Sequence, residues 1–169
     1  MKKSVKGSII DLHVDVIVNA ANTSLLGGGG VDGVIHRAAG PELLEACKTI
    51  GHCDTGKAVI TKAYNISNAK YIIHTPGPVW KGGNNNEVQL LTDSYWNSLM
   101  LAKENNCKSI SFPNISTGVY SFPKIDAAHI ALETVSKFLR EVDNEMEVIL
   151  VCNDVVNYKI YQELCPIIK

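Results

Sequence analysis

The sequence lacks the features that mark several large classes of protein. Its longest apolar runs, such as Val14 to Val18 and Val148 to Cys152, have the length of a strand and are far too short to cross a bilayer. The amino-terminal residues Met1 to Ser4 lead into a strand-like pattern without the apolar stretch of a secretory signal. We therefore expect a cytoplasmic protein with no membrane partner.

An excess of charge of one sign is also missing. The formal net charge is −1, so no basic field attracts a nucleic acid, and we expect no direct nucleic-acid partner. A phosphate group can still be bound, because a few backbone N–H groups hold an anion without a basic surface.

Cysteines are few and show no pairing. The five cysteines of this 169-residue chain are scattered and never spaced Cys-x-x-Cys, so we expect reduced thiols rather than a disulfide framework. Cys47, His52 and Cys53 come closest to a metal-binding group, but their spacing matches no common zinc pattern. We interpret them as packing and loop residues, and we expect no metal and no cofactor.

Repeats, low-complexity tracts and linkers are absent, so we expect one domain over residues 1–169. Short apolar runs bounded by Gly, Pro and Asn predict buried strands at residues 5–10, 14–18, 58–61, 71–74, 109–112 and 147–152. Near-helical spacing of apolar residues predicts helices at 32–39, 41–48, 87–105, 123–140 and 155–164. This alternation predicts an α/β fold with a largely parallel sheet covered on both faces.

Ligands of such sheets bind beyond the carboxyl ends of the strands, which here are the loops after Val18, His74, Phe112 and Cys152. The first loop contains four successive glycines, Gly27 to Gly30, whose N–H groups can form an anion-binding nest just before a helix. The loop after Phe112 offers Ser and Thr hydroxyls beside a glycine, which are ordinary phosphate ligands. The loop after His74 is stiff, and we interpret it as structural.

Two common nucleotide-binding motifs fit poorly. A P-loop requires Lys and Ser or Thr after its glycines, and Val31-Asp32 stands there instead. The pattern Gly28-x-Gly30-x-x-Gly33 matches the dinucleotide fingerprint literally, but a stretch from Asn19 to Leu26 separates it from the preceding strand. A dinucleotide-dependent oxidoreductase stays a minor alternative.

Longer segments carry a more specific pattern. They are Asn19-Ala20-Ala21-Asn22, the run from Gly27 to Gly40, Cys53-Asp54-Thr55-Gly56, the run from Ile73 to Trp80 and the run from Phe112 to Tyr120. In this order, and within a stretch from about Gly7 to about Leu164, they resemble the signature of the macrodomain family, and more narrowly of the MacroD-type ADP-ribosyl hydrolases.

The resemblance implies a three-layer α/β/α sandwich around a mixed, largely parallel sheet, with ADP-ribose bound in a cleft at the strand ends. It also implies a hydrolase that removes mono-ADP-ribose from acidic side chains of proteins, deacetylates O-acetyl-ADP-ribose, or does both. We expect ADP-ribose, an ADP-ribosylated protein or O-acetyl-ADP-ribose as the ligand or substrate, and a monomeric enzyme. A reader module that binds ADP-ribose without cleaving it is the alternative.

Roles for individual residues follow from the resemblance. Asn22 would hydrogen-bond the ribose nearest the leaving group, and Asp32 would orient or deprotonate a water. His36, one helical turn after Asp32, either lines the cleft or has a structural role. The expected ligand-binding residues are Ser8, Ile9, Ala21, Gly28, Gly29, Gly30, Val31, Ser116, Thr117, Gly118, Val119, Tyr120 and Asn153.

The chemistry of the residues agrees with this assignment. The sequence contains no Gly-x-Ser-x-Gly nucleophile motif, and water attack needs none. We treat Asp32 as a solvated carboxylate, ionised at pH 7, whose value lies in positioning water. A helix N-cap is its alternative role, and either Asp32 or a substrate phosphate takes the proton. We expect Asn19 to tie the loop backbone together and His74 to be structural.

Departures from the family pattern cluster where adenine would bind. Ser8 stands where an Asp usually hydrogen-bonds adenine, and Asn153 stands where an aromatic ring often stacks on it. Tyr158 is a possible substitute ring. Asn114 and Ser121 replace a common alanine and a common glycine. The departures predict weaker binding of ADP-ribose, whereas the pairing of Asp32 with Asn22 favours a hydrolase over a reader.

Overall fold

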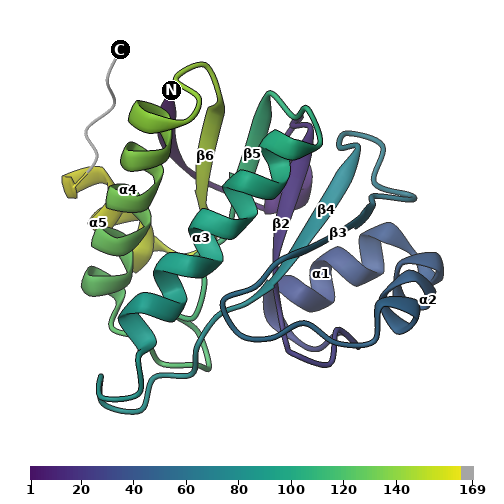
Figure 1. The fold of residues 1–169 in the computed structure, drawn as a ribbon, viewed down its shortest axis with the longest axis horizontal. Coiled ribbons are helices and arrows are strands. Elements are labelled where there is room, and N and C mark those ends of the chain that lie inside the picture. Colours follow the sequence, from purple (N-terminus) through teal and green to yellow (C-terminus); the bar gives the residue numbers. More distant parts are fainter. Residues whose placement is uncertain (165–169) are drawn as a thin grey trace.

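The computed structural model describes residues 1–164, which form a sheet between two layers of helices (Figure 1). The sheet has six strands in the order β1-β6-β5-β2-β4-β3. The pairing of β3 with β4 is antiparallel, and the other pairings are parallel. The strands are β1 (Lys2–Lys6), β2 (Val16–Ala21), β3 (Val59–Lys62), β4 (Tyr71–Pro76), β5 (Ser109–Phe112) and β6 (Glu147–Cys152). The predicted mixed, largely parallel sheet is confirmed.

Alternation along the strands divides the core into two clusters. The helices are η1 (Ile9–Asp11), α1 (Gly30–Ala39), α2 (Pro41–Ile50), α3 (Glu87–Glu104), α4 (Lys124–Glu141) and α5 (Val155–Leu164). Val16, Val18 and Ile73 face the cluster that contains buried residues of α3, α4 and α5. Their neighbours Ile17 and Ile72 face the cluster that contains buried residues of α1 and α2. The period-two pattern therefore creates the three layers.

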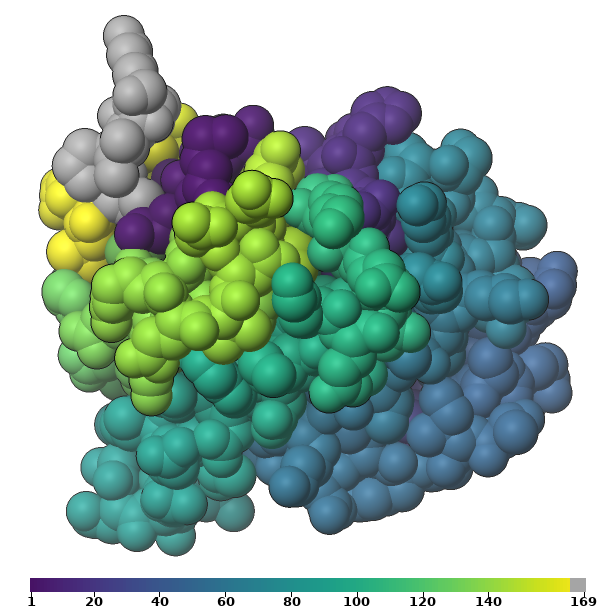
Figure 2. Space-filling view, turned by 45° about the horizontal axis from the view of Figure 1, so that its top comes forward, coloured from purple at the N-terminus to yellow at the C-terminus, as the bar shows by residue number. Residues whose placement is uncertain are grey.

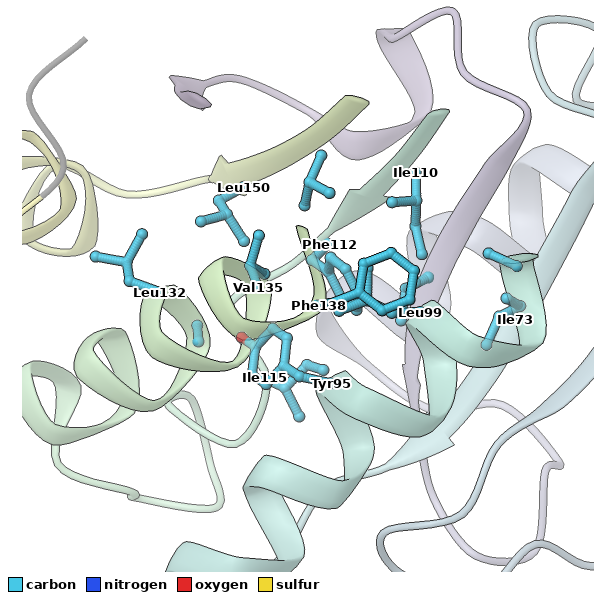
Figure 3. Close-up of a cluster of buried hydrophobic side chains, with 14 of the residues drawn as sticks. Ile73, Tyr95, Leu99, Ile110, Phe112, Ile115, Leu132, Val135, Phe138 and Leu150 are labelled. Carbon is cyan, nitrogen blue, oxygen red and sulfur yellow. The ribbon is translucent and has the colours of Figure 1, made fainter. Parts of the chain in front are cut away.

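The first cluster contains the largest buried rings. Tyr95 of α3 and Phe112 of β5 lie 4.9 Å apart between ring centroids, in a tilted arrangement that aromatic pairs favour. Phe138 of α4 packs beside them, as Figure 3 shows. Trp80 and Trp96 pack against Phe122 and Phe138 respectively.

The amino-terminal residues add an edge strand to the sheet. β1 pairs with β6, and Val148 N–H donates to Met1 O at 2.8 Å. In Figure 2 the purple amino-terminal residues accordingly lie against the yellow-green segment near residue 140.

Four predicted strands have different bounds, although β3 (Val59–Lys62, predicted over 58–61) and β4 (Tyr71–Pro76, predicted over 71–74) differ by only one or two residues. The prediction of a strand over residues 5–10 was wrong at its carboxyl end. The strand β1 stops at Lys6, and Ile9 lies in η1, where it is buried in the second cluster. The strand predicted to end at Val18 continues to Ala21, because β4 pairs with it as far as Pro76. The strands over 109–112 and 147–152 and the helix over 155–164 match their predictions residue for residue.

The described cysteines are buried. Burial is the main cause that raises the pKa of Cys47, Cys53, Cys107 and Cys152 to about 11, so these thiols stay protonated at neutral pH. Cys165 lies outside the described residues. Within residues 1–164, no three His, Cys, Asp or Glu side chains are grouped so as to hold a metal ion. In the same range, no helix is both long and apolar enough to cross a membrane.

Candidate functional site

A cavity of about 790 Å³ opens where the parallel strands end, which is the size range of small-molecule sites. The loops after β2, β5 and β6 supply most of its wall, as the sheet rule predicts. Most residues proposed from the sequence line it, namely Ile9, Ala21, Asn22, Gly28, Gly29, Gly30, Val31, Asp32, Ser116, Thr117, Gly118, Val119, Tyr120 and Asn153.

Three residues do not reach the cavity wall. Ser8 caps η1, where its carbonyl oxygen accepts from Asp11 N–H at 3.1 Å. His36 lies behind Asp32, with Nε2 3.4 Å from Asp32 Oδ1. Tyr158 packs against the first core cluster and is not the substitute ring at the cavity that the sequence suggested.

Sequence reasoning missed several wall residues, of which Gly77, Lys124, Asp154 and Asn157 matter most. The loop after β4 is therefore more than the structural turn that we expected, since it contributes Gly77. Asp154 and Asn157 follow β6, so the same sheet rule that located the other loops was the signal for them.

The first glycine-rich loop exposes backbone to the cavity. Gly27 and Gly30 have φ values of 85° and 56°, which lie in the left-handed region that glycine adopts without a steric penalty. A side chain at Gly29 or Gly30 would meet no atom within 4 Å. Among the described residues, no side chain caps the first turn of α1. The N–H groups at the start of this helix are consequently available to an anion.

The loop after β5 forms the facing wall. Ser116 is buried with a left-handed φ of 68°, which costs energy in a residue other than glycine. Phe122 N–H donates to Ser116 O at 2.9 Å, and Lys124 Nζ donates to Thr117 O at 3.3 Å. These bonds fix the loop and leave the Lys124 ammonium at the cavity wall.

Asp32 lies in the first turn of α1 and is 7% exposed. Asn19 Nδ2 donates to its Oδ1 at 2.8 Å. Burial raises the pKa of Asp32 above its usual range, and the bond from Asn19 and the proximity of His36 offset part of this rise. Two of our expectations were wrong: Asp32 is not a solvated carboxylate, and the N-cap of α1 is Gly29. A carboxylate with a raised pKa is a stronger base than a solvated one.

Asn22 is held by its own loop. Its Nδ2 donates to Gly27 O at 2.8 Å, and its Oδ1 accepts from Ser24 Oγ at 2.7 Å. A methyl group on Gly28 would lie 3.4 Å from Asp32 Oδ2 and 3.8 Å from Asn22 Nδ2. The missing side chain of Gly28 therefore leaves a space that the carboxylate and the amide both border.

Asn19 contacts other side chains, whereas we expected it to tie the loop backbone together. Its Nδ2 contacts two side chains, Asp32 Oδ1 at 2.8 Å and His74 Nδ1 at 3.1 Å, and all three residues are buried. His74 lies behind the cavity wall and not in it.

Comparisons with known proteins agree with this geometry. The family model described as Macro domain matches residues 18–131. A protein of Escherichia fergusonii named O-acetyl-ADP-ribose deacetylase is 57% identical over 163 residues, which cover 94% of this chain and 92% of the relative. A Macro domain-containing protein of Lactiplantibacillus plantarum is 56% identical over 153 residues, covering 90% of this chain and 88% of the relative.

Solved structures give the same result. The macrodomain of Oceanobacillus iheyensis with ADP superposes with a TM-score of 0.91 at 46% identity, covering 96% of this chain and 88% of the other. The macrodomain of Trypanosoma brucei in complex with ADP-ribose has a TM-score of 0.90 at 42% identity, covering 96% of this chain and 68% of the other. At these identities the likeness extends beyond the fold to the sequence.

Proposed function

The chain belongs to the macrodomain family, and on that premise we propose that it is a hydrolase of ADP-ribose esters. It binds ADP-ribose, deacetylates O-acetyl-ADP-ribose, and removes mono-ADP-ribose from acidic side chains of proteins. The observation that carries the proposal is the space beside Gly28, which Asp32 Oδ2 and Asn22 Nδ2 both border at the cavity wall. The relative named O-acetyl-ADP-ribose deacetylase, 57% identical, supports the same activity.

The two loops would clasp the diphosphate. The N–H groups at the start of α1 face an anion from one side, and the loop from Ser116 to Tyr120 faces it from the other. The Lys124 ammonium adds a positive charge at the same wall. In this arrangement the ribose that carries the ester lies beside Asn22 and Asp32.

Deacetylation then proceeds by water attack. The water oxygen bonds to the acetyl carbonyl carbon, the ester C–O bond breaks, and acetate and the free ribose hydroxyl are released. Asp32 positions the water, and either Asp32 or a substrate phosphate takes its proton. The raised pKa of Asp32 favours proton uptake by this carboxylate, because its environment stabilises the neutral acid.

Cleavage from a glutamate or aspartate side chain differs in the bond that breaks. The water oxygen bonds to the anomeric carbon and gives up a proton to Asp32 or a substrate phosphate, the bond from that carbon to the carboxylate oxygen breaks, and the carboxylate leaves. Positive charge develops on the ribose, and the bound diphosphate stabilises it electrostatically. Neither reaction requires a covalent intermediate on the protein.

The experiment is acetate release from O-acetyl-ADP-ribose by the wild type, Asp32→Asn and Asn22→Ala, with ADP-ribose binding measured by calorimetry on the same proteins. The proposal expects turnover by the wild type and a large loss in both variants. Binding without turnover by the wild type would instead favour the reader module, which needs the two loops but not the carboxylate.

We also propose that residues 1–169 form one domain, which acts as a monomer in the cytoplasm. One sheet with a helical layer on each face accounts for the described residues and supports the single domain. Sedimentation of the purified protein measures the oligomeric state directly.

A further inference from the structure

Behind Asp32, a row of buried polar side chains runs away from the cavity across the sheet. Asn19 of β2 is fully buried and donates to Asp32 Oδ1. On the next strand, β4, His74 stands opposite Asn19 in the register, with Nδ1 3.1 Å from Asn19 Nδ2. The other ring nitrogen, Nε2, lies 3.0 Å from Thr61 Oγ1 on β3. None of Asn19, His74 and Thr61 belongs to the cavity wall formed by the described residues.

The hydrogens of this row can be assigned from its contacts. Burial lowers the pKa of His74 to about 3, with a smaller effect of His36, so the ring is neutral at neutral pH and carries one N–H. Thr61 Oγ1 donates its own hydrogen to Lys62 O at 3.1 Å and is left to accept from His74 Nε2. His74 Nδ1 is then an acceptor.

This assignment fixes the orientation of the Asn19 amide. Its two N–H groups donate to Asp32 Oδ1 and His74 Nδ1, both of which are acceptors. A rotated amide would bring its oxygen against a carboxylate oxygen and an imidazole lone pair, which repel it. Asn19 Oδ1 is buried without a hydrogen-bond partner among the described residues, so the two bonds made by Nδ2 hold the amide in place.

We propose that His74 is a positioning residue for ester hydrolysis, which acts through Asn19 to hold Asp32 Oδ1 and so turns Asp32 Oδ2 toward the cavity. Thr61 fixes the ring that does this. The inference rests on the proposed function. It assigns a role in the reaction to two residues on β3 and β4 that are separated from the substrate by Asn19 and Asp32.

The other groups around Asp32 do not replace this support. His36 reaches Asp32 Oδ1 from the same helix, at 3.4 Å. Cys47 of α2 faces it as a protonated thiol, and η1, which also packs against α1, carries the exposed Asp11. If the acceptor nitrogen of His74 is removed, the Asn19 amide is free to rotate. The Asp32 carboxylate then loses a hydrogen bond that favours its charged form.

The test compares His74→Leu, His74→Asn and Thr75→Val with the wild type in acetate release from O-acetyl-ADP-ribose across pH. In His74→Leu we expect kcat to fall about tenfold, the loss expected for one hydrogen bond to a charged group. KM changes little, and the acidic limb of the kcat profile moves to higher pH. His74→Asn, whose side-chain oxygen can replace Nδ1 as the acceptor, restores most of kcat.

Thr75→Val is the matched control, because Thr75 is a fully buried residue of the same strand whose hydroxyl donates to Lys57 O, outside the row. It should lower the melting temperature without moving the pH profile. Thr61→Val, which removes the acceptor of His74 Nε2, should shift the profile in the same direction as His74→Leu and serves where that variant does not fold.

The outcomes separate the two proposals. An active wild type whose pH profile and kcat are unchanged in His74→Leu and Thr61→Val overturns the positioning role alone. A wild type that binds ADP-ribose but releases no acetate overturns the proposed function, and the positioning role with it.

Discussion

Gly77, the residue after β4, packs directly against Ser116 in the loop that faces the glycine-rich one. A methyl group on Gly77 would overlap Ser116 Oγ and Ile115 Cγ2, so the absence of a side chain there sets how deep this loop lies in the cavity wall. The contact couples the end of one strand to a loop that begins 36 residues later in the chain, after Phe112.

Gly77→Ala should therefore displace the loop of Ser116. We expect the free energy of unfolding to fall by about 1–3 kcal/mol, as for other overpacked sites, and the affinity for ADP-ribose to fall as well. Denaturant unfolding and calorimetric titration measure the two effects. Adding Ser116→Gly to Gly77→Ala removes one of the two overlaps and should restore part of both losses. Unchanged affinity in the single variant would show that the loop tolerates the displacement.

The buried carboxylate of Asp32 should destabilise the folded protein. The folded-state pKa of Asp32 is raised above its unfolded value, so the folded state binds more protons and stability falls as pH rises through this window. Asp32→Asn should accordingly increase the free energy of unfolding at pH 7.5, with the gain vanishing below the usual pKa of an aspartate. Urea unfolding at pH 7.5 and at pH 3.5 measures it.

Asp154→Asn is the control, because it should change the free energy of unfolding at pH 7.5 in the opposite direction. Burial acts to raise the pKa of Asp154, but hydrogen bonds from Asn157 outweigh it, and the pKa is lowered. The ionised form of Asp154 therefore stabilises the fold above the usual aspartate pKa, and its replacement should lower stability at pH 7.5. A stability gain in both variants, or in neither, would contradict the burial argument for Asp32.

Lys124 should contribute to binding through its charge. Among the described residues of the cavity wall it is the one basic side chain. We expect Lys124→Met to weaken ADP-ribose binding about tenfold, with a smaller loss at high salt because ions screen the charge. Lys137→Met, on the same helix but over the ring of Trp96, is the control and should bind as the wild type does. Equal binding by both variants would remove Lys124 from the diphosphate site.

A substitution at Asn153 should strengthen the binding of ADP-ribose. Asn153 lines the cavity wall, and Ser8 does not reach it; the family resemblance predicts a ring stacked on the base at Asn153. Asn153→Tyr should strengthen ADP-ribose binding by about 1–3 kcal/mol, the usual worth of base stacking, whereas Ser8→Asp should have a smaller effect. Calorimetric titration distinguishes them, and no gain from Asn153→Tyr would mean that the base lies elsewhere.

The sequence predicts the sheet and the loops of the site, because both depend on local patterns. Turn residues bound each strand, and the rule for parallel sheets locates the ligand at the strand ends without knowledge of the packing. The glycines from Gly28 to Gly30 and the segment from Ser116 to Tyr120 accordingly line the cavity.

The sequence does not predict those features of the site that depend on contacts between residues far apart along the chain. Asn19 and His74 meet only because β2 and β4 pair in a register that sets them opposite each other. The burial of Asp32 depends on how α1 packs on the sheet, so a solvated carboxylate was a reasonable but wrong expectation. Tyr158 illustrates the same limit, since helical spacing alone did not indicate that its ring faces the core.

The central claim is tested most directly by release of ADP-ribose from a glutamate-linked mono-ADP-ribosylated protein, with the wild type beside Asp32→Ala. The account predicts release by the wild type and a loss of at least about a hundredfold in the variant, the size of a typical acid–base contribution, with ADP-ribose binding retained by both. Equal release by the two proteins would contradict the role of Asp32. Binding without release by either would identify a reader of ADP-ribose and not a hydrolase.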